Sequence, residues 1–596
     1  MEHRRYEEGR GRRAVRRVSL GRGDPGRRLG ISLLCIVFVL SLFVGRLIQL
    51  QGLESSGYKQ LAEKEQIVTT TLPAVRGSIT AADGQVLAMT VQTYTIVADP
   101  AQLDAAQQIS DAQALAGPLG MTAAAIESML AHPSSPAYEV LATGVSATAG
   151  AEIDAKNLPQ IQANATYTRE VTPDGESAAD IVGFTNSSSD GVGGIEQEYN
   201  ALLAGHAGSE QAETGINGQM IPLAGEKVTP AVNGDSVTLT IVTSLEWEAE
   251  QECKERVAQT HAKSCTVVVI QPKTGHILAM AQWPTYTQTA SSYPTNLALQ
   301  DVFEPGSTAK VITASAAFEH GGQTPMSAYN IPYAINEGGL WIHDAEWQEG
   351  ERYTIAGIIA NSSNVGMSQV ATHISAQTQY NYLRAFGLGQ LTGVNLPGES
   401  PGILHTLSQY WESLKYTLAY GQGVDVTALQ MAEVYATIAN GGVHVTPTLV
   451  AGVTSSSGHY TQSAPGATNR VIEAKTAKEL VQILQQVPAV DEEANEPWGI
   501  IPGYAVAMKT GTSSESGTNC PDTLCDYGSS LIGMAPGNNA QVVVAVNVQD
   551  PSKANDDYFG DVVAGPVFYN VMKDALRALE IEPDGAQVPK VRLNAP

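Results

Sequence analysis

Three short motifs in this sequence combine hydroxyl, amine and amide side chains in a pattern that suits acyl transfer. The first is STAK at residues 307–310, preceded by FEPG and followed by the apolar stretch VITASAAF. Pro and Gly make a turn and a helix then begins, so we expect Ser307 in its first turn with Lys310 one turn later on the same face. A serine hydroxyl becomes a nucleophile when a nearby base takes its proton. A lysine can be that base once burial or neighbouring cations lower its pKa.

Two further motifs follow along the chain. SSN at residues 362–364 offers the hydroxyl of Ser362 and the amide of Asn364, and KTGT at residues 509–512 ends the apolar strand YAVAM. A lysine at a strand edge beside two hydroxyls suits an anion, because an unpaired charge there is costly. The start of the first helix also supplies a backbone N–H where an oxyanion would form. The three motifs together predict the walls of a serine acyl-transfer site.

Two of these motifs have a second copy, which we interpret as structural. S-x-x-K is expected about once by chance in a chain of this size, and SGYK at residues 56–59 matches it in a polar connector with no apolar helix after it. KTG at residues 273–275 lies in a predicted hairpin turn, where these residue types are ordinary. Singly, each residue of the three motifs could be a helix cap, an exposed lysine or a turn residue. Their order and context favour chemistry.

The elements around the motifs predict a mixed α/β domain. From Cys265, the sequence TVVVIQP-KTG-HILAMAQ predicts two apolar strands around a tight turn, and a helix is expected before them from Leu245 to about residue 261. Helical stretches dominate to about residue 440, and strands return at YAVAMKT, SLIGMAP and QVVVAVNV. Strands at both ends with helices between them predict one sheet that the first and last segments complete and helices flank.

The preceding region predicts an extended, strand-rich module. IVTTTLPAV and TYTIVADP are apolar and β-branched stretches around a turn at residues 83–84. Residues 101–160 are Ala- and Gln-rich with helical spacing, and GIEQEYNALLAG at residues 194–205 predicts a helix that closes the module. A polar helical connector is expected at residues 54–66.

Length, charge and hydropathy place the chain at a membrane. Its 596 residues exceed one typical domain. The first 28 residues contain ten Arg and four acidic residues. The remaining residues contain 24 basic and 56 acidic side chains, so this part has a net charge of −32. Such a negative charge repels phosphate backbones and argues against nucleic acid as a partner. Residues 29–50 have no charge before Arg46 and are long enough to cross a bilayer. The Arg-rich flank predicts a cytoplasmic N-terminus. A cleaved signal peptide is the alternative.

The five cysteines offer two candidate disulfides for an exported chain, Cys253 with Cys265 and Cys520 with Cys525, and leave Cys35 in the predicted span. The sequence leaves both pairings open. The histidines are scattered, and neither H-E-x-x-H nor a phosphate-binding glycine loop occurs. We therefore expect no cofactor and no metal.

The ordered motifs resemble those of the penicilloyl-serine transferase superfamily, which includes penicillin-binding proteins and class A β-lactamases. RGSITAADGQVLA at residues 76–88 resembles a signature of class B penicillin-binding proteins, and GGIEQEYNALLAGHAG at residues 193–208 resembles their pedestal motif. TGVNLPGESPG at residues 392–402 and YGQGVDVTALQMA at residues 420–432 resemble their transpeptidase segments. The sequence FEPGSTAK at residues 303–310 is most similar to the corresponding segment of division-specific FtsI-type enzymes of actinobacteria.

That resemblance implies the penicilloyl-serine transferase fold, with a central antiparallel sheet flanked by helices, behind an extended pedestal domain and one transmembrane helix. The expected division is a cytoplasmic tail at residues 1–28, the span at 29–50, the pedestal, or dimerisation-type, domain at 51–240 and the transpeptidase domain at 241–596. It implies a single-pass protein of the cell membrane with its catalytic domain outside the cytoplasm.

The resemblance also implies a D,D-transpeptidase that acts on peptidoglycan stems ending in D-Ala-D-Ala, in septal wall synthesis. Ser307 would attack the penultimate carbonyl with Lys310 as base, and the backbone N–H groups of Ser307 and Thr512 would form the oxyanion hole. Ser362 would pass the proton to the departing amine. β-Lactams would acylate the same serine.

On the binding side, Asn364 would bind the amide of the stem, and Lys509, Thr510, Gly511 and Thr512 would form the edge that receives the terminal carboxylate. A partner of the FtsW-type membrane glycosyltransferase class, with other divisome proteins, would supply the glycan strand.

Three alternatives stay open at this point. A β-lactamase or penicillin sensor shares the motifs, although the E-x-x-L-N pattern that positions deacylating water in class A enzymes is missing. The same transpeptidase chemistry could serve elongation or sporulation. The chain could also act chiefly as a scaffold for a polymerase.

Overall fold

The computed structural model describes residues 25–53, 67–171, 177–213, 227–285, 295–345, 348–493, 495–514, 527–552, 558–585 and 588–596. Its contacts divide the chain into two compact units, residues 1–72 with 208–230 and residues 73–207 with 231–596. The SGYK copy, the connector expected at residues 54–66 and the Cys520–Cys525 pair lie outside the described residues.

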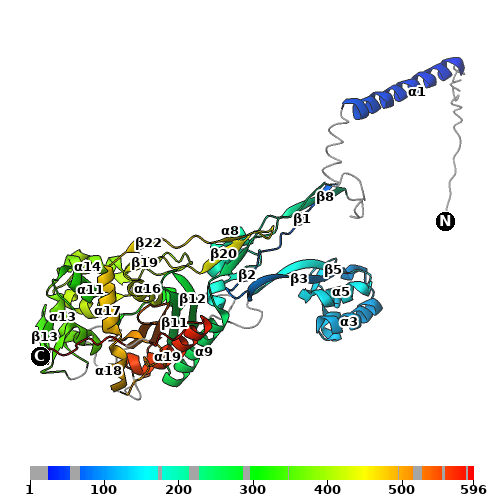
Figure 1. Cartoon of the computed structure of the whole chain (residues 1–596). Helices are drawn as coiled ribbons and strands as arrows, with labels where there is room; N and C mark the ends of the chain where they lie inside the picture. The colour runs from blue at the N-terminus through cyan, green and yellow to red at the C-terminus, as the bar shows by residue number, and fades with distance from the viewer. Residues whose placement is uncertain are drawn as a thin grey trace, which may run out of the picture. The chain divides into compact units, whose positions relative to one another are not determined.

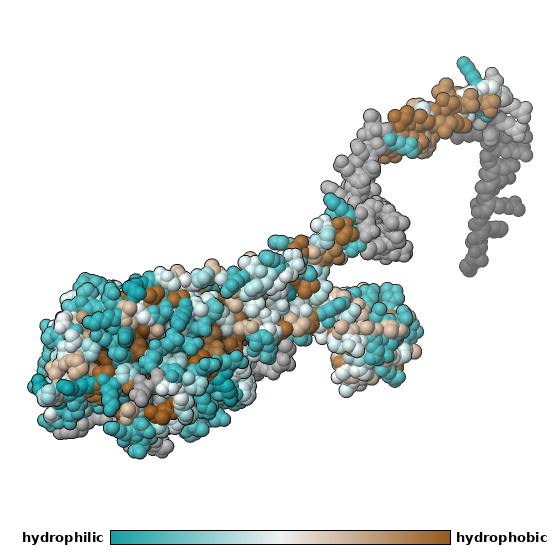
Figure 2. All heavy atoms as spheres, viewed as in Figure 1, coloured by the Kyte–Doolittle hydropathy of each residue, from teal (hydrophilic) through white to brown (hydrophobic). Residues whose placement is uncertain are grey.

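The first unit contains one long apolar helix and a small sheet. Helix α1 (Pro25–Ile48) begins with a proline, which suits the first helical position, and continues into a π-helical turn at Gln49–Leu53. Within residues 26–51, an 18-residue window reaches a mean hydropathy of 2.6, so this segment is long and apolar enough to cross a membrane. Figure 2 shows apolar residues gathered along this helix. Strands β1 (Ile67–Leu72), β8 (Gly208–Glu213) and β9 (Lys227–Thr229) form an antiparallel sheet in the order β1-β8-β9.

The second unit opens with a twisted sheet that carries a helical lobe (Figure 1). Its order is β21-β20-β10-β2-β3-β4, and β5 also pairs with β3. The strands are β2 (Ile79–Thr80), β3 (Val86–Ala98), β4 (Glu139–Ser146), β5 (Ile161–Val171), β10 (Ser236–Leu239), β20 (Val450–Thr454) and β21 (Tyr460–Gln462). The lobe helices are α3 (Ala105–Leu119), α4 (Ala123–Ala131) and α5 (Ala147–Ala155). Because β20 comes from the late part of the chain, residues 79–98 and 450–462 share one sheet.

Two expectations for this region need correction. The Ala-rich stretch 101–160 is not wholly helical, because β4 interrupts it; Val140, Thr143 and Val145 are β-branched, and pairing with β3 outweighs the helical composition around them. The segment 194–205 forms two short helices, α7 (Gly194–Glu198) and α8 (Asn200–Leu203), instead of one.

A buried ion network joins two of the motifs noted in the sequence. The Nε of Arg76 donates to Glu196 at 2.7 Å, and the Nε of Arg169 donates to the other oxygen of the same carboxylate at 2.7 Å. Arg76 also donates to the amide oxygen of Asn200 at 2.7 Å. The side chain of Glu196 has no solvent exposure. The RGSIT and GGIEQ segments are therefore held together by charge-assisted hydrogen bonds across 120 residues of sequence.

The main sheet of the second unit is antiparallel, in the order β12-β11-β25-β24-β23. Its strands are β11 (Ser264–Gln271), β12 (His276–Trp283), β23 (Ala507–Ser514), β24 (Tyr527–Ala535) and β25 (Val542–Gln549). The predicted hairpin is confirmed as β11 and β12, and β11 pairs with β25, so early and late segments complete one sheet as expected. Strand β23 lies at an edge of the sheet.

Helices cover both faces of this sheet, which explains why its strands are continuously apolar. Val267 and Val269 pack into one core with α9 (Thr243–Thr260) and α19 (Gly560–Ala578), whereas Val268 and Ile270 pack into another core that includes α16 (Ala428–Ala439). Cys253 of α9 forms a disulfide with Cys265 of β11, which confirms the first candidate pair.

Shorter elements lie between β12 and β23. The helices are α10 (Leu297–Gln300), α11 (Lys310–His320), α12 (Ile355–Ala360), α13 (Asn364–Ala371), α14 (Ala376–Ala385), α15 (Leu414–Thr417), α17 (Ala474–Leu484) and α18 (Val487–Glu493). Small antiparallel pairs are β13 (Ala328–Asn330) with β16 (Arg352–Thr354), β14 (Ala334–Glu337) with β15 (Leu340–His343), β17 (Ile403–Leu404) with β18 (Val424–Asp425) and β19 (Val443–Val445) with β22 (Thr468–Arg470).

Candidate active site

Ser307 lies on a tight turn that leads directly into helix α11. Residues 306–309 form a 3₁₀ turn, and α11 begins at Lys310. Gly306 has a φ of +53°, and a Cβ built on it would lie 2.7 Å from the carbonyl oxygen of Thr512, so a glycine lets this turn approach strand β23. The N–H of Gly306 donates to the carbonyl of Gly421 at 3.0 Å. The turn is therefore fixed between the YGQG segment and the KTGT strand.

Lys310 points back toward Ser307 in a buried setting. Its Nζ donates to the Oγ of Ser307 at 2.9 Å, lies 3.3 Å from the Oγ of Ser362 and also donates to the carbonyl of Ser362. Lys310 has no solvent exposure. Burial lowers the pKa of Lys310 well below its ordinary value, the positive charge of Lys509 lowers it further, and the negative charge of Asp344 opposes both.

The SSN motif forms a turn between α12 and α13. Ser362 has a φ of +58°, in the left-handed region that non-glycine residues seldom occupy. Ser363 is the N-cap of α13 and accepts from the N–H of Gly366 at 2.9 Å. Asn364 begins α13 and is half-buried, and among the described residues its side-chain amide has no hydrogen-bond partner. That amide is free to bind a ligand.

The KTGT motif occupies the edge strand β23. Lys509 is 1% exposed, and its Nζ donates to the carbonyl and hydroxyl oxygens of Thr510, each at 3.1 Å. A Cβ on Gly511 would lie 2.8 Å from the carbonyl of Pro305 and 2.5 Å from the Oγ of Ser530, so a side chain there would push this strand away from the Ser307 turn. The Oγ of Thr512 accepts from the N–H of Gly560 at 3.0 Å.

The structure thus brings all three motifs to one place. Ser307, Lys310 and Ser362 are joined by hydrogen bonds, and Thr512 adjoins the turn that carries Ser307. Lys509 acts on Lys310 through its charge. A hydroxyl, an amine whose pKa is lowered and a second buried lysine therefore surround one position, an arrangement suited to activating a serine and binding an anionic end group.

The second KTG copy forms a hairpin turn, as expected from the sequence. Residues 273–275 form the turn between β11 and β12, and the Nζ of Lys273 donates to Asn539 at 3.0 Å. Thr274 caps the turn through Gln271 at 2.7 Å.

Asp344 is a site neighbour that the sequence did not indicate. One carboxylate oxygen accepts from the Oγ of Ser363 and the other from the N–H of Val365, both at 2.9 Å, so Asp344 holds the SSN turn from outside it. Tyr435 was missed as well; its hydroxyl is buried and donates to the carbonyl of Thr308 at 2.9 Å. Neither residue belongs to a recognisable local pattern, because both act through contacts between distant segments.

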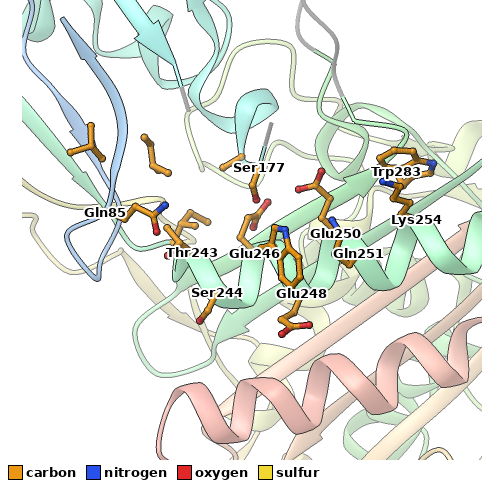
Figure 3. A pocket seen from close by; sticks show the side chains of 15 residues that line it. Gln85, Ser177, Thr243, Ser244, Glu246, Glu248, Glu250, Gln251, Lys254 and Trp283 are labelled. Atoms are coloured by element: carbon orange, nitrogen blue, oxygen red, sulfur yellow. The ribbon is translucent and has the colours of Figure 1, made fainter. Parts of the chain in front are cut away.

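A separate cavity of about 500 Å³ lies along helix α9 (Figure 3). Glu246 and Glu250 line it, with Ser177 opposite, and Asp180 lies close enough to interact with both carboxylates. Burial, with a smaller contribution from the neighbouring carboxylates, raises the pKa of Asp180 to about 7 and that of Glu246 to about 8. No residue of the three motifs lines this cavity. Across the described ranges, no set of three or more His, Cys, Asp and Glu side chains is placed to hold a metal ion.

Comparison with known proteins identifies the family. The model of the penicillin binding protein transpeptidase domain matches residues 265–573, and that of the penicillin-binding protein dimerisation domain matches residues 71–239. The penicillin-binding protein PbpB of Mycobacterium tuberculosis is 31% identical over 565 residues, which cover 90% of this chain and 83% of that protein. The peptidoglycan D,D-transpeptidase FtsI of Escherichia coli K12 is 30% identical, with 92% of this chain and 91% of that protein covered.

Among solved structures, the crystal structure of penicillin binding protein 3 from Mycobacterium tuberculosis in complex with aztreonam is similar, with a TM-score of 0.67 and 27% identity. The match covers 88% of this chain and all of that one. Sequence and structure therefore agree that this chain belongs to the class B penicillin-binding proteins, with the dimerisation domain and the transpeptidase domain of that family.

Proposed function

We propose that this chain is a peptidoglycan D,D-transpeptidase that cross-links stem peptides during septal wall synthesis and is acylated by β-lactams. The observation that carries the proposal is the 2.9 Å hydrogen bond between the Nζ of Lys310 and the Oγ of Ser307, made where burial lowers the pKa of the lysine. Because its pKa is lowered, this lysine is more readily neutral than an ordinary one, and a neutral amine can accept the hydroxyl proton as the serine attacks. The relatives named as peptidoglycan D,D-transpeptidase and PbpB support the reaction class.

In the proposed first step, the Oγ of Ser307 attacks the penultimate D-Ala carbonyl of a donor stem while its proton passes to Lys310. The backbone N–H groups of Ser307 and Thr512 stabilise the oxyanion. The proton then reaches the departing D-Ala amine through Ser362, the C–N bond breaks, and an acyl ester remains on Ser307. An amine of a neighbouring stem attacks that ester, regenerates the hydroxyl and completes the cross-link.

The proposed binding groups surround that reaction centre. Asn364 binds the amide of the stem, a role that its unpartnered side chain supports. Lys509, Thr510, Gly511 and Thr512 receive the terminal carboxylate at the strand edge. A buried ammonium beside hydroxyl donors favours a carboxylate over a neutral end group, because a charge-assisted hydrogen bond is stronger than a neutral one.

Covalent labelling tests the nucleophile. The full chain with a fluorescent penicillin is expected to give one adduct, and mass spectrometry should place it on the peptide that contains Ser307. The Ser307→Ala variant should give none. Ser56→Ala is the matched control, because it removes the serine of the other S-x-x-K copy, and it should label like the unmodified chain. Labelling of Ser307→Ala would refute the assignment.

We further propose the topology and partners that this function requires. The Arg-rich residues 1–28 lie in the cytoplasm, residues 29–50 cross the membrane, and the pedestal at 51–240 and transpeptidase domain at 241–596 lie outside. The apolar helix α1 and the two matched family domains support this division. A phosphatase reporter that needs export should be active when fused after residue 53 and inactive when fused after residue 20.

The glycan strands are proposed to come from an FtsW-type membrane glycosyltransferase within the divisome. A septal role predicts that a fluorescently tagged full chain gathers at the division site. Uniform labelling of the side wall would instead favour an elongation enzyme with the same chemistry.

A further inference from the structure

Residues 588–596, called the strap below, run along strand β16 and extend its small sheet. Ala595 donates its N–H to the carbonyl of Arg352 at 2.8 Å, and Asn594 pairs antiparallel with Tyr353. Figure 1 places this end of the chain beside β13, the other partner of β16. Val591 and Leu593 pack on the core, whereas residues 592 and 594 are exposed. This alternation is that of an edge strand with one buried face.

The strap forms hydrogen bonds with Thr354, the N-cap residue of helix α12. The N–H of Thr354 donates to the carbonyl of Leu593 at 2.8 Å, and its hydroxyl donates to the carbonyl of Arg592 at 2.7 Å. The same hydroxyl accepts from the N–H of Gly357 at 3.1 Å and caps α12. A Cβ on Gly357 would lie 2.2 Å from the carbonyl oxygen of Leu593, so the strap lies in direct contact with the first turn of the helix.

Helix α12 in turn sets the position of the SSN turn. Asn361 donates its N–H to the carbonyl of Gly357 at 2.9 Å, and Ser363 donates its N–H to the carbonyl of Ile358 at 2.9 Å. Between them Ser362 holds its left-handed φ and presents its carbonyl and hydroxyl to Lys310. Six residues of helix therefore separate the strap contacts from the groups that touch the proposed base.

We propose that the strap is a positioning element of the acyl-transfer site, which it serves by fixing α12 and thereby the placement of Ser362 against Lys310. The proposal rests on the proposed function of the site. Among the described residues, no hydrogen bond joins the strap to any of the three motifs, and its contacts with the start of α12 are those with Thr354 and Gly357. Displacement of a reacting or supporting group by about 1 Å is enough to slow catalysis as much as a hundredfold.

The test compares the rate and the stoichiometry of covalent penicillin binding in full-length protein in detergent. Two variants disturb the strap: Thr354→Val, which lacks the hydroxyl that joins Arg592 to Gly357, and a chain that ends at residue 589. We expect acylation to be about tenfold to a hundredfold slower in both, with about one adduct per protein molecule retained. Thr354→Ser keeps the hydroxyl and should recover the unmodified rate to within about twofold. Arg592→Ala is the matched control, because only its backbone carbonyl is used, and it should acylate at the unmodified rate.

The two readouts separate positioning from a purely stabilising role. A strap that only stabilised the fold would lower the number of adducts per molecule and leave the rate of the remaining active molecules unchanged; that result would overturn the proposal. Unchanged rate and stoichiometry in Thr354→Val and in the shortened chain would overturn it too. Failure of the unmodified chain to form an adduct would overturn the proposed function, and this proposal with it.

Discussion

The Nζ of Lys310 donates to the Oγ of Ser307 at 2.9 Å, in a site where Lys310 is fully buried. Burial makes the largest contribution and lowers the pKa of Lys310. The positive charge of Lys509 lowers this pKa further, and the negative charge of Asp344 raises it. The protonation of the proposed base is thus adjusted by two charged residues that can be changed one at a time. The pH dependence of acylation should report on each of them.

Asp344→Asn should move the rising limb of the acylation pH profile to lower pH. The carboxylate stabilises the ammonium form of Lys310, so its removal lowers the pKa of the amine, and the neutral base becomes populated at a lower pH. The measurement is the second-order rate constant of penicillin acylation across pH 5 to 10. Ser363→Ala is the control, because it breaks the 2.9 Å contact with Asp344 but keeps the charge, and its midpoint should not move. A shift to higher pH in Asp344→Asn would contradict this view.

Lys509→Met should move the same limb in the opposite direction. Loss of the neighbouring positive charge raises the pKa of Lys310, so a higher pH is needed to generate the neutral base. Because Lys509 is also proposed to bind the carboxylate of the ligand, the rate at the optimum should fall by at least about tenfold. A profile displaced in the same direction as that of Asp344→Asn would be incompatible with this assignment of charges.

Gly421→Ala should slow acylation without touching any reacting group. Gly421 has a φ of +84°, and a Cβ there would lie 2.0 Å from the carbonyl of Gly306, so the Ser307 turn must move. We expect a loss of roughly tenfold to a hundredfold in the acylation rate. Gly322→Ala is the matched control, because Gly322 also has a positive φ but a Cβ there meets no atom within 4 Å. If both variants acylated equally slowly, backbone strain and not the contact with Gly306 would be the cause. If neither variant were slowed, the contact would have no role in placing the Ser307 turn.

Glu196→Gln should destabilise the pedestal strongly. The change leaves Arg76 and Arg169 buried without their counter-charge, and breaking a buried pair in this way costs on the order of 3–5 kcal/mol. Chemical denaturation followed by fluorescence should show the pedestal unfolding at a lower urea concentration. Glu152→Gln offers the comparison: its pair with Lys156 is solvent-exposed, so the expected cost is below about 0.5 kcal/mol. Similar midpoints for the two variants would argue against a structural role for the network.

Glu246→Gln should raise thermal stability at alkaline pH. Burial first, and then the charge of Asp180, raises the pKa of Glu246 from 4.5 to about 8, so the folded protein holds a proton that the unfolded chain loses. Stability therefore falls as pH rises between about 4.5 and 8, and the neutral amide removes this fall. The melting temperature of the variant should exceed that of the unmodified chain at pH 8.5 and match it near pH 4.5. Glu248→Gln, on the same helix, is the control. A pH-independent difference would contradict the proposed protonation.

The parts of this molecule that sequence reasoning predicts are those with local causes. The STAK spacing brings Ser307 and Lys310 together because one helical turn separates them, and the continuous apolar runs predict strands covered on both faces. Strand β4 was missed because pairing with β3 outweighs an Ala-rich helical composition. Asp344 contacts the SSN turn across 21 residues of sequence, and the strap contacts Thr354 across 239 residues. No periodicity in these segments predicts either contact.

The sheet shared by β2, β10 and β20 has a practical consequence for work on the catalytic half alone. Residues 236–239 pair with 79–80 on one side and with 450–454 on the other. A recombinant fragment starting at residue 241 would lack β10, the strand that pairs with β20. The backbone donors and acceptors of β20 would then be exposed, and such an edge is prone to self-association. A soluble fragment intended for inhibitor screening is therefore better begun upstream of residue 79, with the whole sheet intact.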